Sequence, residues 1–554
     1  MRDMLAGDYL DQAGIIALQT ISGYIGDPLL TELLTQMHEG MRDGSLFIFG
    51  EDLSEDTLNK VRLSAWSNLI GLPGEYKPVI FDGTRLFFHK YYEKETSLLE
   101  SLKNLASLED RPAPKDTFAS LENLKLDKGQ KDCVRMALLR PFFVMTGGPG
   151  TGKTSTMAEI LALWLQSGLQ ADSIALTAPT GRASQRMKET LENHVALQGR
   201  ETEDIQIGTI HRLLEYSPRK HEFRYHAEEP LPFSLIIVDE VSMVDVALMQ
   251  ALLSAIDPQK TRLILIGDRD QLPSVEAGAV LASILSSQNS RIYSGSLCHL
   301  KTVFRSKANI LRVANGINKG QTPDLNPVQI QKSKDYQTEE DVVCLIESKD
   351  EKILLSSFFS FWFAQYIPLC QKLNRTLDES EFLLNSLFRE LEQSRVLCIQ
   401  KEGKRGVHYI NQYFSYLAGP EFDPDYNAGS WFHGQPVLIL SNQISREIYN
   451  GDVGVILRDP DGEFRVWFRR GKQFQWFWLM DMPQMQPGFC ITVHKSQGSE
   501  FENILVVLPQ SDHRLLSREI LYTAFTRAKS RVFVAGDEEL IQIASRRSQH
   551  RQVR

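Results

Sequence analysis

The chain alternates short apolar runs with stretches whose apolar residues recur at helical spacing. Runs of buried-strand length lie at 141–146, 173–178, 234–238 and 262–266. Between them apolar residues recur three to four positions apart, as at 155–165, which predicts helices that cover a sheet. Strands separated by helices form a parallel sheet, and its ligands bind outside the carboxyl ends of the strands. An α/β domain is therefore expected in the first half of the chain.

The pattern changes in the second half. Residues 354–369 have helical spacing and many aromatic side chains, which predicts core packing more strongly than a base-stacking surface. A further buried strand is expected at 395–399. From 431 to 480 short β runs are separated by turns such as Asn450-Gly451, a pattern typical of a small antiparallel barrel whose aromatic residues fill its interior.

Residues 1–110 carry no catalytic motif. Helical spacing at 18–41 is followed at 78–89 by two short predicted strands around the Asp82-Gly83 turn. This pattern predicts a small α+β module, which either packs on the rest of the chain or docks a partner chain. The proline-containing stretch 111–115 is typical of a linker.

Composition narrows the class of protein. The 554 residues suffice for several domains, and a hydrophobic share of 42% with a charged share of 24% is ordinary for a soluble protein. No apolar stretch approaches the length that spans a membrane, and the N-terminus does not resemble a signal peptide. Six scattered cysteines without a C-x-x-C pair predict reduced thiols in a cytoplasmic protein and no zinc site. Because the net charge is −9, a nucleic-acid partner would need local cationic grooves.

The first apolar run leads directly into a phosphate-binding pattern. Gly147-x-x-x-x-Gly152-Lys153-Thr154 stands between a predicted strand and a predicted helix, so phosphates would lie at the helix N-terminus. Lysine in this pattern contacts the β- and γ-phosphates, and threonine contacts Mg²⁺. The expected nucleotide-binding residues are Gln130, Gly147, Gly148, Pro149, Gly150, Thr151, Gly152, Lys153, Thr154 and Ser155. The amide of Gln130 can pair with an adenine edge, although an exposed helix glutamine is the alternative.

Acidic residues follow the third apolar run. Asp239 is expected to hold Mg²⁺ through water, and Glu240 to orient and deprotonate the attacking water. The next run ends at Gly267-Asp268, with Gln271 placed to sense the γ-phosphate. The sequence thus predicts a site that hydrolyses ATP with Mg²⁺.

Six further segments follow in a recognisable order. They cover residues 177–183, 209–214, 238–243, 267–273, 493–500 and 521–529. These segments resemble the successive motifs of superfamily 1 helicases, and in detail those of the RecD branch. A looser similarity to RecD N-terminal domains lies at 82–86 and 91–95.

The resemblance implies a domain plan. It implies two RecA-like motor domains that hold ATP between them. The first motor domain is expected at 116–290, with a small hairpin insertion at 216–230. The second is expected at 291–430 and 481–554, interrupted by an SH3-like barrel at 431–480. Residues 1–110 would be a partner-docking domain.

The resemblance also implies two arginine fingers. Arg305 and Arg527 match the arginines that reach the nucleotide from the second motor domain. A guanidinium in that place neutralises charge on the transferring phosphoryl group and is worth roughly 10³ to 10⁵ in rate. An isolated arginine would more often be a surface ion-pair partner.

A translocating motor grips a nucleic-acid backbone with hydroxyls, amides and cations. The matching candidates are Thr180, Arg182, Thr209 and His211 in the first motor domain, and Thr492, His494, Lys495 and Ser496 in the second. Relatives carry a duplex-splitting hairpin between the segments that begin at Thr209 and Val238. Phe223 or Tyr225 is expected to contact the junction there.

The expected function is that of an ATP-driven DNA helicase. The resemblance implies 5′-to-3′ movement on single-stranded DNA. It also implies a heterotrimer with RecB-like and RecC-like subunits, which acts on double-stranded DNA to repair double-strand breaks. The expected location is the bacterial cytoplasm, and no membrane partner is expected. No acidic cluster beyond Asp239-Glu240 suggests a nuclease site of its own. A stand-alone RecD-like helicase and a nucleotide-gated clamp that does not unwind are the alternatives. The complete set of hydrolytic groups favours a motor over a clamp.

Overall fold

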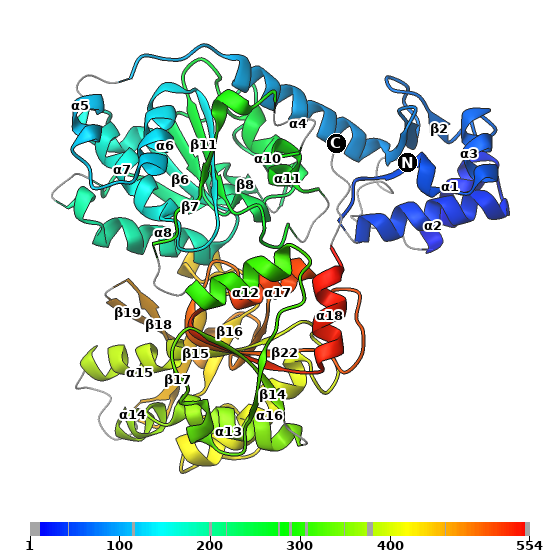
Figure 1. Cartoon of the computed structure of the whole chain (residues 1–554). Coiled ribbons are helices and arrows are strands. Elements are labelled where there is room, and N and C mark those ends of the chain that lie inside the picture. The colour runs from blue at the N-terminus through cyan, green and yellow to red at the C-terminus, as the bar shows by residue number, and fades with distance from the viewer. Residues whose placement is uncertain are drawn as a thin grey trace.

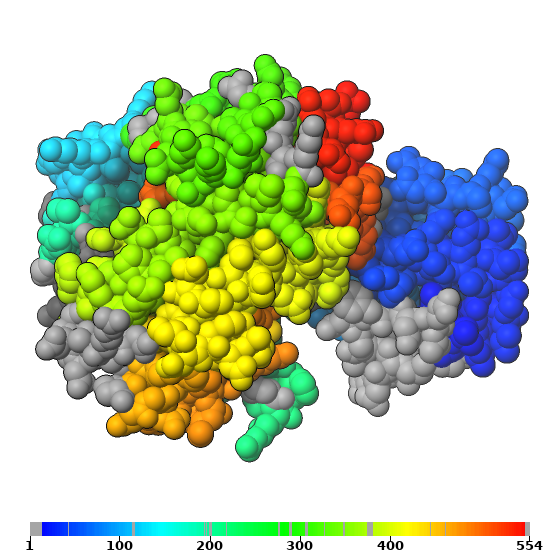
Figure 2. Space-filling model, turned by 90° about the horizontal axis from the view of Figure 1, so that it is seen from below, coloured from blue at the N-terminus to red at the C-terminus, as the bar shows by residue number. Residues whose placement is uncertain are grey.

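The computed structural model describes residues 12–42, 44–113, 117–198, 202–217, 219–274, 278–286, 291–304, 308–347, 350–373, 381–459, 461–471 and 473–548. Two α/β bodies lie one above the other, and a smaller module projects to one side of the upper body (Figure 1). The space-filling view shows the same module standing beside the main mass of the protein (Figure 2).

The first α/β domain is built on six parallel strands. Their order is β12-β5-β11-β10-β6-β7, with bounds β5 Phe142–Gly147, β6 Ile174–Ala178, β7 Gln206–Thr209, β10 Leu235–Val238, β11 Arg262–Gly267 and β12 Leu297–Leu300. The central strands β5, β10 and β11 are buried at every position, as continuous apolar strands between two helical layers should be. The helices include α5 Thr117–Glu122, α6 Lys128–Leu139, α7 Lys153–Gln166, α8 Gly181–Asn193, α9 Ile210–Leu213, α10 Val246–Ser254 and α11 Val280–Ile284.

The expected boundary at residue 290 is too early. β12 pairs in parallel with β5, so residues up to Leu300 belong to the first sheet. This strand was not predicted because its burial is incomplete: only Leu300 of its four residues is buried.

The second α/β domain repeats the plan with six parallel strands in the order β13-β14-β23-β22-β15-β21. The strands are β13 Asn326–Gln329, β14 Val342–Glu347, β15 Ser394–Cys398, β21 Cys490–Thr492, β22 Phe501–Val507 and β23 Ala528–Ala535. Its helices are α12 Ala308–Asn318, α13 Glu351–Phe363, α14 Tyr366–Leu373, α15 Glu381–Gln393, α16 Val407–Phe422, α17 Arg518–Phe525 and α18 Glu538–Arg546.

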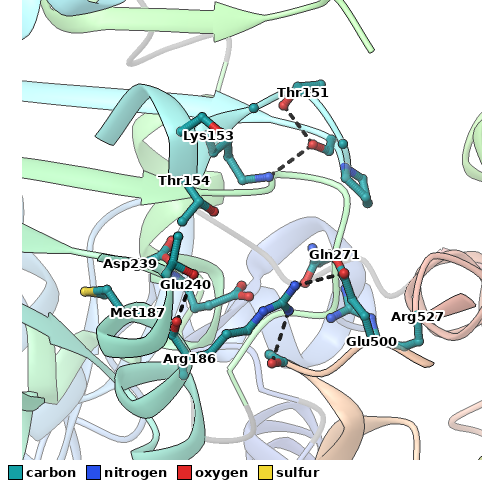
Figure 3. Close-up of a pocket in the computed structure, with 18 of the residues that line it drawn as sticks. Thr151, Lys153, Thr154, Arg186, Met187, Asp239, Glu240, Gln271, Glu500 and Arg527 are labelled. Carbon is teal, nitrogen blue, oxygen red and sulfur yellow. Dashed lines mark hydrogen bonds and ion pairs between the residues drawn. The ribbon is translucent and has the colours of Figure 1, made fainter. Parts of the chain in front are cut away.

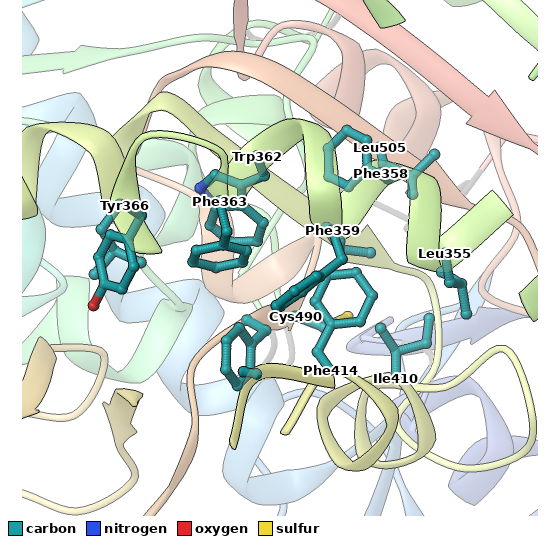
Figure 4. Close-up of a cluster of buried hydrophobic side chains, with 14 of the residues drawn as sticks. Leu355, Phe358, Phe359, Trp362, Phe363, Tyr366, Ile410, Phe414, Cys490 and Leu505 are labelled. Carbon is teal, nitrogen blue, oxygen red and sulfur yellow. The ribbon is translucent and has the colours of Figure 1, made fainter. Parts of the chain in front are cut away.

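The aromatic stretch of this domain is core, as predicted. Phe359, Trp362, Phe363 and Tyr366 are buried, and their rings contact one another and aromatic rings of α16 (Figure 4). No single described helix is long and apolar enough to cross a membrane. The bent pair α13 and α14 passes that test together by length and composition only, and these are the helices that carry the buried aromatics.

A five-stranded antiparallel sheet is inserted into the second domain, in the order β19-β18-β17-β16-β20. It consists of β16 Pro436–Ile439, β17 Val453–Arg458, β18 Phe464–Arg470, β19 Gln473–Trp478 and β20 Met485–Pro487, so it extends beyond the expected end at residue 480. Its aromatics do not all fill its interior. Val466 and Phe468 are buried there, whereas Trp476 and Trp478 on the edge strand are 37% and 38% exposed.

The N-terminal module has the predicted α+β composition. It contains α1 Gln12–Ser22, α2 Pro28–Arg42, β1 Phe47–Phe49, α3 Glu55–Arg62, β2 Ile70–Gly71, β3 Val79–Phe81, β4 Arg85–Phe88 and α4 His89–Ser107. Its sheet order is β1-β4-β3-β2, and the Asp82-Gly83 turn joins β3 to β4. Phe47, Phe87 and the leucines of α4 share a hydrophobic core with α10. The module therefore packs on the first α/β domain, which was one of the two expected arrangements.

The expectation that all thiols are reduced is wrong for one pair. Cys133 of α6 and Cys298 of β12 form a disulfide across a sequence separation of 165 residues. The other four cysteines are free and buried. Spacing in the sequence could not signal this pair, because the two residues meet only where β12 and α6 pack together.

Candidate nucleotide site and strand path

One cavity of about 410 Å³ lies where the two α/β domains meet (Figure 3). The carboxyl ends of β5 and β10 lead into its wall, as expected for ligands of a parallel sheet. The first domain contributes the loop 148–155 and several side chains of α8, and the second contributes Gly498, Glu500 and Arg527. Figure 3 shows Lys153 and Thr154 on one side of the cavity and Gln271, Glu500 and Arg527 on the other. The site is therefore shared between the domains.

The loop between β5 and α7 is shaped to hold an anion. Gly150 and Gly152 have φ of 75° and 81°, which side-chain-bearing residues rarely adopt. A Cβ at Gly152 would lie 2.5 Å from the side-chain amide nitrogen of Gln130, so a side chain there would displace Gln130. Lys153 Nζ donates to the carbonyls of Gly147 and Gly148 at 2.5 and 3.1 Å. Its cation and the N-terminus of α7 face the same cavity, an arrangement that favours phosphate.

Gln130 lies against this loop but serves its own helix. Its backbone N–H donates to Asp127 Oδ1, and its side-chain oxygen accepts from the Asp127 N–H at 3.1 Å, which forms a capping box at the start of α6. The residue is buried and is absent from the cavity lining. The exposed-glutamine alternative is thus wrong, and an adenine contact remains a prediction.

Asp239 and Glu240 stand at the end of β10 and line the cavity. Burial raises the pKa of Asp239 to about 6, and the neighbouring Glu240 carboxylate adds to the rise. Glu240 has φ of 53°, and its N–H donates to Asp239 Oδ1 at 2.8 Å. Two adjacent carboxylates with Thr154 on the same cavity fit a divalent cation, because a buried carboxylate that is costly to ionise gains most from a positive partner.

The predicted residues of the second domain reach the site unequally. Arg527 is 3% exposed and lines the cavity, with Nε donating to Thr523 O at 3.1 Å and Nη1 to Ser499 O at 3.4 Å. Glu240 and Glu500 supply negative charge close to its guanidinium. Gln271 is buried and also lines the cavity. Arg305 lies outside the described residues.

Several cavity residues were missed by the sequence analysis, among them Arg186, Phe304 and Glu500. Arg186 of α8 forms an ion pair with Glu500 at 2.9 Å across the domain boundary, and its Nη1 donates to Gly498 O at 3.3 Å. The Phe304 N–H donates to Gly150 O at 3.0 Å. Glu500 ends a helicase-like segment and could have been listed. Arg186 lies beyond its segment and enters the site only because α8 runs along the cavity.

Two of the four predicted strand contacts of the first domain, Arg182 and Thr209, line two smaller cavities beside α8, whereas Thr180 and His211 line neither of them. Thr180 and Thr209 cap α8 and α9 by accepting from the N–H groups of Ala183 and Arg212. Thr209 lines a cavity of about 120 Å³ together with Lys188, Arg212, Tyr449 and Arg470, and Arg182 lines one of about 200 Å³ with Glu392, Arg469 and Arg470. Both cavities lie between the first domain and the inserted sheet.

The second-domain candidates are less accessible than expected. His494 and Lys495 are half-buried, and burial lowers the pKa of Lys495. Thr492 is buried and accepts from the Lys495 N–H. Ser496 is fully buried and donates to Val493 O at 2.6 Å. The expectation that Ser496 contacts a strand is therefore wrong for this arrangement, because the short turn that follows β21 encloses its hydroxyl.

The predicted hairpin exists, as β8 Tyr216–Ser217 paired with β9 Glu222–Phe223. Phe223 and Tyr225 are half-buried and pack toward the first-domain core. The Phe223 ring lies 5.2 Å from that of Tyr216 and 5.9 Å from that of His211. These aromatics form the base of the hairpin. The exposed residues at its turn are Arg219, Lys220 and His221.

Phosphate-binding groups from one parallel sheet face a buried arginine from another, so the chain has the construction of a two-domain nucleotide-driven motor. Family models agree in both halves. An AAA domain matches residues 130–277, and a UvrD-like helicase C-terminal domain matches residues 487–535.

Individual proteins that are similar to this chain indicate its family more specifically. The RecBCD enzyme subunit RecD of Mycolicibacterium smegmatis is 34% identical over 87% of this chain and 83% of its own length. RecD of Haemophilus influenzae is 29% identical over 86% and 80%. The ATP-dependent RecD2 DNA helicase of Deinococcus radiodurans is 31% identical over 73% of this chain but only 48% of its own length. The chain therefore belongs to the RecD family of superfamily 1 helicases.

Solved structures are more distant. The Pif1 helicase of Candida albicans aligns with 76% of this chain and 97% of its own, at 15% identity and a TM-score of 0.42.

Proposed function

We propose that this chain is the motor subunit of a RecBCD-type helicase–nuclease, an ATP-driven helicase that moves 5′ to 3′ on single-stranded DNA. One observation carries the proposal: Lys153 and Glu240 of the first domain and Arg527 of the second line the same cavity. A change in the occupant of that cavity must alter the relative position of the domains, and a motor requires such a change.

The residues of the cavity have separate proposed roles. Lys153 binds the β- and γ-phosphates, and Thr154 and Asp239 would hold Mg²⁺, which when bound neutralises phosphate charge. Glu240 accepts a proton from the attacking water, and Gln271 orients that water. Arg527 stabilises charge that develops on the transferred phosphoryl group, with Arg305 as the second candidate for that role.

The proposed domains follow the sheets. The first motor domain extends to about residue 300, the second continues to residue 548 and beyond, and the inserted sheet from 436 to 487 forms an SH3-like barrel. The N-terminal module is the proposed docking site for RecB-like or RecC-like chains. In support, Ile25, Leu63, Leu72 and Tyr76 are all at least 60% exposed on it, and large exposed apolar side chains gather where a partner binds. The nuclease would belong to those other chains, in the bacterial cytoplasm.

The proposed strand path runs over Thr180, Arg182, Thr209, His494 and Lys495. The cationic groups of α8 and the inserted sheet support it, because a phosphate backbone needs such groups along a groove. Arg219 and Lys220, at the turn of the hairpin, are better placed to meet a duplex than Phe223 and Tyr225 at its base.

The test is steady-state ATPase with and without single-stranded DNA, for wild type and Lys153→Gln. The expected result is DNA-stimulated hydrolysis that the substitution abolishes. Lys260→Gln is the matched control, because that lysine is 82% exposed and lies outside the cavity. Rates that neither DNA nor Lys153→Gln changes would refute a motor and favour the clamp.

A second measurement separates the remaining alternatives. Unwinding of 5′-tailed but not 3′-tailed duplexes is expected for the proposed polarity. Co-purification with two further chains is expected for a complex subunit, whereas full unwinding by the chain alone and no stable partner would indicate a stand-alone helicase.

A further inference from the structure

The loop that follows β11 crosses from the first domain into the second. Leu272 is fully buried within the hydrophobic core of the second domain, among residues of α12 and α17. Its N–H donates to Thr523 Oγ1 at 3.0 Å, and its carbonyl accepts from Gln497 Nε2 at 3.0 Å. Both backbone polar groups of this first-domain residue are therefore bound by the second domain.

Asp268, four residues earlier, connects this loop to the nucleotide cavity. It is 1% exposed, and its Oδ2 accepts from Gln271 Nε2 at 3.1 Å. The same oxygen accepts from the hydroxyl of Tyr522, which lies on α17 of the second domain, at 3.3 Å. One carboxylate oxygen thus binds a donor from each domain.

Tyr522 also touches the phosphate loop. The ring is 1% exposed, and a Cβ built on Gly148 would lie 3.4 Å from the hydroxyl oxygen. The hydroxyl therefore sits where the phosphate loop, the end of β11 and α17 meet. Neither Tyr522 nor Asp268 lines the cavity, so neither is expected to contact nucleotide directly.

The orientation of Gln271 depends on this contact. Its Nε2 is bound to Asp268, whereas its Oε1 is buried without a hydrogen-bond partner among the described residues. An amide held by its nitrogen presents its oxygen, which can accept a hydrogen bond from an attacking water. The position of Asp268 therefore determines where that oxygen points.

We propose that Tyr522 is a positioning residue for ATP hydrolysis: its hydroxyl, supplied by the second domain, fixes Asp268 and through it the Gln271 amide. The inference rests on the proposed function. Asp268 Oδ1 also accepts from the N–H of Asp270 at 3.1 Å, within the first domain. The inference links hydrolysis to domain closure, because the Tyr522 hydroxyl reaches Asp268 Oδ2 only when α17 is docked on the loop.

Electrostatics agree with a donor role. Burial raises the pKa of Tyr522 well above its usual value, and the Asp268 carboxylate adds to the rise. The hydroxyl therefore keeps its proton throughout the physiological range and can only donate to the carboxylate. A buried carboxylate that loses a donor has no water to replace it, so the effect on Asp268 should be large.

The test is Tyr522→Phe in the full chain, with any partner chains that co-purify. The ring is kept, so packing in the second-domain core should be preserved. Loss of a hydrogen bond to a charged group predicts a fall in DNA-stimulated kcat of roughly ten- to a hundred-fold, with KM for ATP changed less than about two-fold. Tyr336→Phe is the matched control, because it removes another buried hydroxyl of the same domain, which donates to Leu354 O at 3.1 Å away from the cavity.

A double-mutant cycle with Asp268→Leu separates positioning from general destabilisation. If the hydroxyl acts through Asp268, the double variant should be no slower than Asp268→Leu alone. Multiplicative effects, or a kcat for Tyr522→Phe equal to that of the Tyr336→Phe control, would overturn the inference. A wild-type chain without DNA-stimulated hydrolysis would instead overturn the proposed function, so the two failures are distinguishable.

Discussion

The two parallel sheets each carry a glycine-containing strand–loop–helix unit, and the two units use their helix N-termini differently. After β5, the loop carbonyls of Gly147 and Gly148 are bound by the Lys153 side chain, and the loop wraps an open cavity. After β15, the first N–H groups of α16 turn back on the loop: Val407 N–H donates to Gln400 O, and His408 N–H to Lys401 O.

This difference makes the loop of the first domain a candidate phosphate site and the loop of the second domain a poor one. A helix N-terminus attracts an anion only while its N–H groups lack partners. In the second domain those donors are satisfied by the chain itself. The comparison shows that shared topology does not fix the role of a loop, because the direction of a few N–H groups decides it.

The largest expected effect is on ATP hydrolysis, when the arginine that the second domain contributes to the shared cavity is removed. Arg527→Ala should lower DNA-stimulated kcat by roughly 10³-fold or more, while nucleotide binding persists, because the guanidinium acts on charge formed during phosphoryl transfer. Steady-state kinetics and nucleotide-binding fluorescence would measure the two quantities. Arg389→Ala, at a largely exposed arginine of the same domain, is the control. A variant that loses binding and hydrolysis equally would show that Arg527 is structural.

A smaller effect, on the coupling of ATP hydrolysis to unwinding, is expected from a change in the loop that follows β11. Leu272→Ala removes a buried side chain of the first domain from the core of the second, and large-to-small changes of this kind cost about 2 to 5 kcal/mol. Unwinding per ATP hydrolysed should fall more than ATPase itself. Parallel unwinding and ATPase assays would show this ratio, and an unchanged ratio would argue against mechanical coupling through Leu272.

The third prediction concerns the acidic end of β10. Burial holds the pKa of Asp239 at about 6, above its usual 3.8, so ionisation of this carboxyl destabilises the folded nucleotide-free chain as pH rises through that range. Asp239→Asn should therefore stabilise the nucleotide-free chain by about 1 to 3 kcal/mol above pH 6 while abolishing hydrolysis.

The stabilisation by Asp239→Asn should fade as pH falls from 6 toward 4, because the folded chain then holds Asp239 protonated and no longer buries its charge. Denaturant melts at pH 8 and pH 4 would measure this. Equal stability of wild type and variant at both values would contradict the expectation.

The smallest effect is expected in the second domain's own loop. Lys404→Gln should change KM for ATP by less than about two-fold, because the N-terminus of α16 is already satisfied by its loop. The same substitution at Lys153 should remove ATP hydrolysis. A large rise in KM for Lys404→Gln would mean that both loops contact nucleotide and would end the contrast between the domains.

Much of the fold was readable from the sequence where burial is complete. The strands β5, β10 and β11 were predicted because each contains a continuous run of at least four apolar residues, and every position in them is buried. β12 and β20 were missed, because they are short and only partly buried and therefore carry no clear pattern. The α+β module and the aromatic core of α13 were predicted correctly from the spacing of their apolar residues.

The residues of the candidate site were likewise predicted only in part. Asp239 and Glu240 were found because they directly follow a buried strand, and the edge of a parallel sheet gathers such residues. Lys153 was found from the glycine-rich pattern between a strand and a helix. Arg186 was missed because nothing along the chain marks which helix face lines a cavity. Ser496 was assigned wrongly, because its motif gave no information on the burial of its hydroxyl.

The sequence by itself determined the two parallel sheets, the phosphate loop with its acids, and membership of the RecD family. Those features are local, since a strand, a turn and a capped helix are specified by neighbouring residues. Tertiary structure alone decided which groups meet across the domain boundary: Arg186 with Glu500, Leu272 with the second core, Tyr522 with Asp268, and Cys133 with Cys298. Apart from the packing of Leu272 on α12, these contacts join residues more than 160 positions apart, and only the packing of complete domains brings them together.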